Sequence, residues 1–261
     1  MASRHIAVVV ISALISIGGP LAVGGLAETE RDSYVAPPTY PAWFVNPPSG
    51  SPDSLLWATG CTRAYGTLEQ GTPESRHEAY TNAREAYQHV LTGERLYESR
   101  PGHTPVSRGQ RFARSEYPDT LTAVTYRDSA QTAGMTLTLA SWDPRDANPP
   151  IDTSAVTFSK IPPSWTNASD VGPNRAVGIS TMYYRECQAW QEATEKAYEQ
   201  LAIETTANVQ AMHRSIKGRR HEVYRIRTAV RVHRARVADR WSDGRYAYVL
   251  LQANVEALNI D

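Results

Sequence analysis

The chain lacks most of the features that assign a protein to a functional class. Its 27 Lys and Arg residues balance 27 Asp and Glu residues over 261 positions, so overall charge does not point to a nucleic-acid partner. It has no Gly-x-Ser-x-Gly elbow, phosphate-binding glycine loop or dinucleotide fingerprint. Its seven histidines form no His-Glu-x-x-His motif and have no cysteines at zinc-ligand spacing. These absences predict a protein that is not an enzyme and holds no cofactor or metal ion.

Cysteine is scarce, because Cys61 and Cys187 are the only two. In an oxidising compartment the pair can form a disulfide, which would connect the two halves of the chain. The pair can also remain as two free thiols, since a disulfide needs a Cα separation that a sequence does not define. Both alternatives stay open here, and counting free thiols in denatured, unreduced protein would separate them.

A long apolar run occurs only near the first residue. Arg4 and His5 precede an almost unbroken apolar segment over residues 6–17, and Gly25-Leu26-Ala27 places small residues at the cleavage positions. This pattern predicts a secretory signal peptide over residues 1–27. The alternative is an uncleaved membrane anchor, but Gly18-Gly19-Pro20 interrupts the run short of the roughly 20 apolar residues that a span needs. We therefore expect secretion across the inner membrane and a periplasmic or outer-membrane-associated location.

One pattern occurs twice, about 120 residues apart, and such self-similarity governs the interpretation of a fold. The first copy contains Pro41-Ala42-Trp43 and then Ala58-Thr59-Gly60, and the second contains Pro163-Ser164-Trp165 and then Ala176-Val177-Gly178. An alanine-spaced helical pattern follows in both. The predicted organisation is a signal peptide (1–27), a linker (28–40), a first module (41–143), a proline-rich linker (144–161) and a second module (162–261).

In the first copy, apolar residues recur at helical spacing over residues 75–94, which predicts a helix. Residues 99–117 carry prolines and glycines with little periodicity and are predicted to form a loop or an irregular crossing. Residues 121–127 and 135–142 are predicted strands of a hairpin whose turn lies at residues 130–134.

In the second copy, helical spacing extends over residues 187–212. From Tyr224 apolar and basic residues alternate as in a strand with one apolar face, and the phase reverses at His233-Arg234, which predicts a β-bulge. A turn at residues 241–245 then leads to a last strand over residues 246–254. The sequence thus predicts an α+β fold with two tandem modules, each a helix packed on an antiparallel sheet with a C-terminal strand hairpin.

Basic residues are concentrated between His213 and Arg240, with ten Lys and Arg against two acids. On one strand face, arginines would form a stripe able to bind phosphate or carboxylate groups. The alternative is a set of solvated edge charges that prevent aggregation between strands. The candidate residues for an anionic partner are Arg225, Arg227, Arg231, Arg234 and Arg236.

The Pro-x-Trp segments, the strands containing Ala-x-Gly, the alanine-spaced helices and the closing hairpin over residues 237–250 resemble the LPP-twenty lipoprotein family. That family is similar to the amino-terminal domain of the flagellar H-ring assembly protein. The resemblance covers residues 164–254 well and residues 41–143 more loosely. It implies an envelope-associated α+β protein without catalytic residues. Members are usually lipidated on an N-terminal cysteine, whereas no cysteine precedes Cys61, so no lipid anchor is predicted.

Two functions are compatible with these patterns. The first is a non-enzymatic envelope protein that binds other envelope proteins in an oligomeric assembly, such as one at a flagellar base. The alternative is a module that binds an anionic glycan or cell-wall polymer through the basic strand face. Secretion argues against nucleic acid as the partner. Added salt separates the two functions, because it weakens binding through exposed charges and a packed protein interface resists it.

Overall fold

The computed structural model describes residues 38–48, 55–64, 66–99, 106–115, 121, 124–142, 149–167, 171–182, 185–214 and 222–259, without the side chains of 96–99, 106–110, 206–214 and 222–226. The predicted signal peptide lies outside these residues, as do most of the first linker and residues 144–148 of the second. Within the described part, no helix is both long and apolar enough to cross a membrane.

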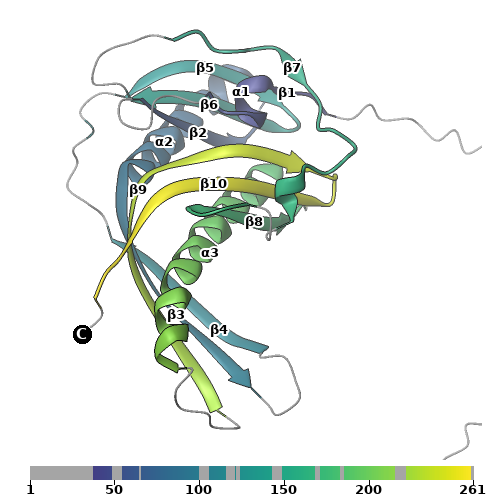
Figure 1. The fold of residues 1–261 in the computed structure, drawn as a ribbon. Helices are drawn as coiled ribbons and strands as arrows, with labels where there is room; N and C mark the ends of the chain where they lie inside the picture. The colour runs from purple at the N-terminus through teal and green to yellow at the C-terminus, as the bar shows by residue number, and fades with distance from the viewer. Residues whose placement is uncertain are drawn as a thin grey trace, which may run out of the picture. The chain divides into compact units, whose positions relative to one another are not determined.

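The described residues form helices and strands in mixed order (Figure 1). The helices are α1 (Ala42–Val45), α2 (Leu68–Tyr87), the short 3-10 helix η1 (Ser164–Thr166) and α3 (Glu186–Arg214). The strands are β1 (Tyr40–Pro41), β2 (Leu56–Arg63), β3 (Gln88–Ser99), β4 (Val106–Ser115), β5 (Thr125–Thr132), β6 (Met135–Trp142), β7 (Ala155–Val156), β8 (Arg175–Thr181), β9 (Glu222–Ser242) and β10 (Tyr246–Ala257).

All strand pairs are antiparallel. A five-stranded sheet has the order β4-β3-β9-β10-β8, a three-stranded sheet has the order β2-β6-β5, and β1 pairs with β7. Helix α3 packs against β8, β10 and β9, while α2 packs against β2 and β6 and also contacts β9 (Figure 1). The predicted α+β class is confirmed.

The two similar sequence segments adopt matching local geometry. The indole Nε1 of Trp43 donates to Asp128 Oδ2 at 2.8 Å, and Nε1 of Trp165 donates to Asp239 Oδ2 at 2.8 Å. Both aspartates directly follow a register shift in their strand, opposite Leu139 in one case and Leu250 in the other. A tryptophan after proline is therefore tied to the same point of a bulged strand in each copy.

A glycine lies at the helix crossing in each copy. A Cβ atom on Gly60 would lie 2.1 Å from the carbonyl oxygen of Ser75 in α2, and one on Gly178 would lie 1.8 Å from that of Ala193 in α3. No side chain fits at these distances, so glycine allows the helix backbone to contact the strand. The Ala-x-Gly segments thus set how closely each helix approaches its sheet.

The two copies do not have separate hydrophobic cores. One buried cluster joins Leu56, Ala83 and Leu91 to Leu201 and Val230, and the second joins aromatic residues of α1 and β2 to α3 and β10. In addition, β3 of the first copy pairs with β9 of the second from Gln88 to Ser99. The structure therefore does not confirm a division into two modules.

Residues 88–99 form a strand, so the predicted helix over residues 75–94 is wrong at both ends. The helix begins at Leu68, where Thr67 and Gln70 form a capping box, and ends at Tyr87. Its successor β3 is held by ladders to both β4 and β9, pairings that helical spacing does not reveal. Gly93, a poor helix former, lies in the middle of β3 beneath the ring of Phe112.

The loop predicted over residues 99–117 is also wrong in part, because Val106–Ser115 form β4. This polar segment is a strand because it pairs with β3 through backbone hydrogen bonds, a pairing that its own sequence pattern does not predict. The predicted strand over residues 121–127 is displaced to Thr125–Thr132, because the turn consists only of Ala133 and Gly134, whose φ angles are 48° and 73°. Strand β6 has the predicted bounds.

The bulge predicted at His233-Arg234 is confirmed. Arg234 has φ of 51°, and the register between β9 and β10 shifts opposite residues 252–254. The buried positions change phase there, from Val230 and Val232 to Ala235. A second shift at Ala238, not predicted, turns Arg240 into the interior.

Candidate functional site

Four of the five arginines proposed to bind an anionic partner have a described neighbour within the chain. Arg227 Nε lies 3.6 Å from Glu94 Oε2, and Arg231 Nη1 lies 3.4 Å from Glu256 Oε2. Glu94 and Glu256 are the directly opposed residues on β3 and β10. These half-exposed pairs contribute little to stability, but they offset the positive charge that an anionic polymer would need.

From the bulge onwards, the arginines contact aromatic and amide groups in place of carboxylates. The Arg234 guanidinium lies 4.9 Å from the ring centroid of Tyr87 and 5.5 Å from that of Trp142, an arrangement of cation–π contacts. Arg236 Nη2 donates to Gln252 Oε1 at 3.0 Å. The backbone of Arg225 lies in β9, but its side chain is outside the described set. Binding of an anionic polymer by these residues stays a prediction.

The two cysteines are joined in a disulfide, one of the two alternatives that the sequence left open. Their Cα atoms are 5.7 Å apart and their sulfur atoms 2.12 Å apart. Cys61 lies in β2 and Cys187 in the first turn of α3, and both are buried. The bond therefore links the sheet of the first copy to the helix of the second.

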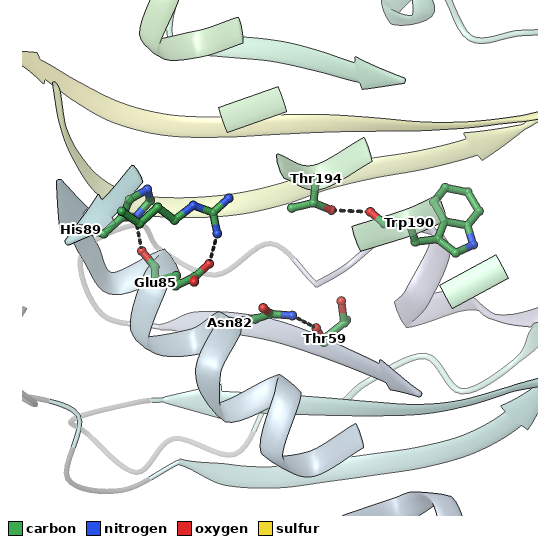
Figure 2. Close-up of polar contacts among 7 residues, drawn as sticks. Thr59, Asn82, Glu85, His89, Trp190 and Thr194 are labelled. Carbon is green, nitrogen blue, oxygen red and sulfur yellow. Dashed lines mark hydrogen bonds and ion pairs between the residues drawn. The ribbon is translucent and has the colours of Figure 1, made fainter. Parts of the chain in front are cut away.

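Cys61, one half of the disulfide, lines a cleft of about 590 Å³ that also has residues of α2 and α3 in its wall. The α2 side carries Glu74, Glu78, Asn82 and Glu85, while α3 contributes a mixed aromatic and polar surface. Figure 2 shows the hydrogen bonds in this region, including Asn82 Nδ2 to the carbonyl oxygen of Thr59 at 2.8 Å. The cleft thus combines acidic side chains with buried backbone groups.

Glu78 places a carboxylate oxygen within 4.8 Å of both sulfur atoms of the disulfide. It accepts a hydrogen bond from Gln191 Nε2 at 2.6 Å, across the cleft from α3. Burial raises its pKa above the ordinary value, and hydrogen bonds from Gln191, the backbone of Cys61 and Asn82 oppose that effect. Within the described part of the chain no cation forms an ion pair with Glu78, so its charge is balanced only by hydrogen bonds.

The other end of the cleft contains a compact polar group. Arg114 of β4 forms an ion pair with Glu85 and lies 4.9 Å from the ring centroid of Tyr198. His89 is 3% exposed, and its Nδ1 lies 2.7 Å from the carbonyl oxygen of Glu85 (Figure 2). A carbonyl can only accept, so Nδ1 carries the proton. Burial lowers the pKa of His89 to about 4, which keeps the imidazole neutral.

Arg240 has a structural role at the junction of the two copies. Its guanidinium donates to the carbonyl oxygen of Phe44 and to Thr59 Oγ1, both at 2.6 Å. It also lies 4.3 Å from the Phe44 ring centroid, and burial lowers its pKa. These contacts tie β9 to α1 and β2.

Among the described residues, strand β8 has one edge that no strand pairs with. Met182 N–H donates to the Arg245 carbonyl, and Ala253 N–H donates to that of Asn174, just beyond the two ends of β8. Because hydrogen-bonded and non-bonded pairs alternate in an antiparallel ladder, the residues of β8 whose N–H and C=O groups point away from β10 are Arg175, Val177, Ile179 and Thr181.

The side chains of these four residues lie on the sheet face opposite α3, since the alternate positions Ala176 and Ser180 are buried beneath the helix. Ile179 is 42% exposed, and Tyr246 on the neighbouring strand is 38% exposed. No described strand pairs with this edge. Free backbone groups and partly exposed apolar side chains therefore occur together along β8.

Glu78 and Gln191 were not among the residues singled out from the sequence. Helical spacing identifies only one buried side of α2, so it gave no signal for the contact of Glu78 with α3. The repeat gave a partial signal, because it marks Gly60 as the glycine that contacts the helix. Gly60 meets Ala79, so Cys61, which follows Gly60, lies near Glu78, which precedes Ala79. Comparisons of this chain with family models, curated proteins and solved structures find no match.

Proposed function

We propose that this chain is a non-enzymatic protein of the cell envelope that binds an extended segment of another envelope protein along β8, as part of an assembly such as a flagellar base. The observation that carries the proposal is the free edge of β8, with its outward backbone groups and exposed Ile179. The predicted signal peptide and the sequence resemblance to envelope lipoproteins support the proposed compartment.

Strand addition at this edge is physically favourable. An incoming strand would form main-chain hydrogen bonds with Val177 and Ile179, and its alternate side chains would contact Ile179 and the neighbouring tyrosines. Natural edge strands are usually protected by charge, proline or a bulge. In β8 only Arg175, at one end, provides such protection. An edge with so little protection is suited to pairing with a strand of a specific partner.

The proposal is tested by site-specific photo-crosslinking in cells. A photo-reactive amino acid at Val177 should capture one envelope protein, while the same group at Gln188, on the exposed side of α3, should not. Ile179→Pro removes an outward N–H that the internal ladder does not use, so the fold should persist and the crosslink should be lost. Ile179→Val, which retains the N–H, is the matched control.

Equal crosslinking from Val177 and Gln188, or an unchanged crosslink in Ile179→Pro, would refute binding along β8. Recovery of cell-wall fragments instead, with release by added salt, would favour the polymer-binding alternative. Circular dichroism of each variant verifies that the fold is retained.

A further inference from the structure

Three side chains with metal-binding atoms converge beside the cleft, and two of them, Cys61 and Glu78, line it. Sγ of Cys61, Sγ of Cys187 and a carboxylate oxygen of Glu78 all lie within 4.8 Å of one another. They come from three different elements, β2, α3 and α2. Two sulfur ligands and one carboxylate form a donor set suited to Zn²⁺, which binds thiolate, imidazole and carboxylate groups in tetrahedral geometry.

We propose that the reduced pair Cys61 and Cys187 binds a zinc ion together with Glu78, so that the disulfide and the metal site are alternative states of the same residues. A dithiol reductant converts the disulfide to two thiols and is itself oxidised to a disulfide. Zn²⁺ then displaces one proton from each thiol and binds the two thiolates and the ionised carboxylate. This proposal does not depend on binding at β8.

The positions of the ligands are fixed by packing that does not require the sulfur–sulfur bond. The backbone contact at Gly60 holds β2 against α2. Trp190 and Ala193, in the turns of α3 that follow Cys187, belong to a buried cluster that also contains residues of β2 and β6. Two thiolates at about 2.3 Å from one Zn²⁺ lie about 3.8 Å apart, so side-chain rotation alone can open the pair.

Glu78 is already oriented as metal ligands commonly are. Gln191 Nε2 and the backbone N–H of Cys61 donate to its carboxylate, and such outer hydrogen bonds fix the direction of a ligand. No cation of the described chain pairs with it, so a metal ion would supply the missing counter-charge. With three protein ligands, the fourth position would face the cleft of about 590 Å³, where water or a small ligand can enter.

Cobalt titration of the full-length protein tests the site, because Co²⁺ substitutes for Zn²⁺ and its thiolate complexes have a near-ultraviolet charge-transfer band. After reduction with a phosphine, we expect one equivalent of Co²⁺ to give this band and Zn²⁺ to abolish it. The oxidised protein should give no band. Glu78→Gln should weaken Co²⁺ binding at least tenfold. Glu74→Gln, an exposed carboxylate one turn earlier in α2, should bind Co²⁺ like the unmodified chain.

Three results would overturn the proposal. The first is the absence of a thiolate band in reduced protein, and the second is equal Co²⁺ affinity in Glu78→Gln and Glu74→Gln. The third is loss of the near-ultraviolet circular dichroism on reduction without recovery on addition of Zn²⁺, because the fold then does not hold the ligands together. Glu78→Gln keeps both cysteines and the disulfide, so its folding can be verified in the oxidised state.

Discussion

The buried imidazole of His89 predicts a measurable loss of stability in acid. Its pKa is lowered from 6.5 to about 4, chiefly by burial, with Arg114 and His233 adding repulsion against the bond to Glu85. The unfolded chain therefore binds a proton at His89 more readily than the folded chain does. The stability due to this group is complete above pH 6.5 and is lost as pH falls towards 4.

The magnitude follows from the difference between the two pKa values. At about 1.36 kcal/mol per pKa unit, a pKa lowered from 6.5 to about 4 corresponds to about 3 kcal/mol of stability. Most of this stability is lost at about pH 4.5. Partly buried carboxylates with raised pKa values, such as Glu78 and Glu85, act in the opposite direction, since their folded forms gain protons first. A single pH profile therefore mixes the two contributions.

The substitution His89→Phe separates them. Phenylalanine keeps an aromatic ring against Tyr198, whose ring centroid lies 5.0 Å from that of His89, but cannot take up a proton. Urea unfolding at about pH 7 and pH 4.5 should show that the unmodified protein loses about 2.5 kcal/mol more than His89→Phe. His77→Gln, on the exposed side of α2, is the control. Equal losses in the unmodified protein and His89→Phe would show that His89 is not buried as described.

Three further substitutions or treatments test the fold. Gly178→Ala places a methyl group 1.8 Å from a carbonyl oxygen of α3, so thermal unfolding should show a destabilisation of about 3 kcal/mol or more. An unchanged melting temperature would contradict the close contact between β8 and α3. Reduction of Cys61 and Cys187, separated by 126 residues, should lower the free energy of unfolding by up to about 5 kcal/mol, measured in urea with and without a phosphine. Trp165→Phe leaves the half-buried Asp239 carboxylate without its 2.8 Å hydrogen bond, which should cost about 1 to 3 kcal/mol; in urea unfolding, no change would mean that water replaces the indole.

Local patterns predicted those elements that local physics determines. Strand β6, the hairpin of β9 and β10 and the bulge at Arg234 follow from alternation and its change of phase. Helix α3 follows from apolar spacing, extending slightly beyond its predicted ends. Each of these features is set by residues close together in the chain.

Elements that depend on distant partners could not be predicted in the same way. Leu91 has the spacing of a helix residue, and only pairing with Val230 and its neighbours makes it part of a strand. The disulfide could not be predicted without the distance between Cys61 and Cys187. The role of Glu78 could not be predicted without knowing that α2 packs on a sheet and also contacts α3 through Gln191. The sequence did not reveal the acidic partners of the basic stripe. Glu94 and Glu256 lie on β3 and β10, far in sequence from the arginines of β9 that they contact.

The pairing of β3 with β9 has a consequence for synthesis of the chain. Strand β3 emerges early, yet its neighbour from Glu222 onwards is among the last segments to be made. Contacts of such high sequence separation form slowly, because loop closure must precede them. Until then β3 presents an unpaired edge of the kind that aggregates. A nascent chain of this protein would therefore benefit from a chaperone that covers residues 88–99 until residues 222–233, their partners in β9, have been made.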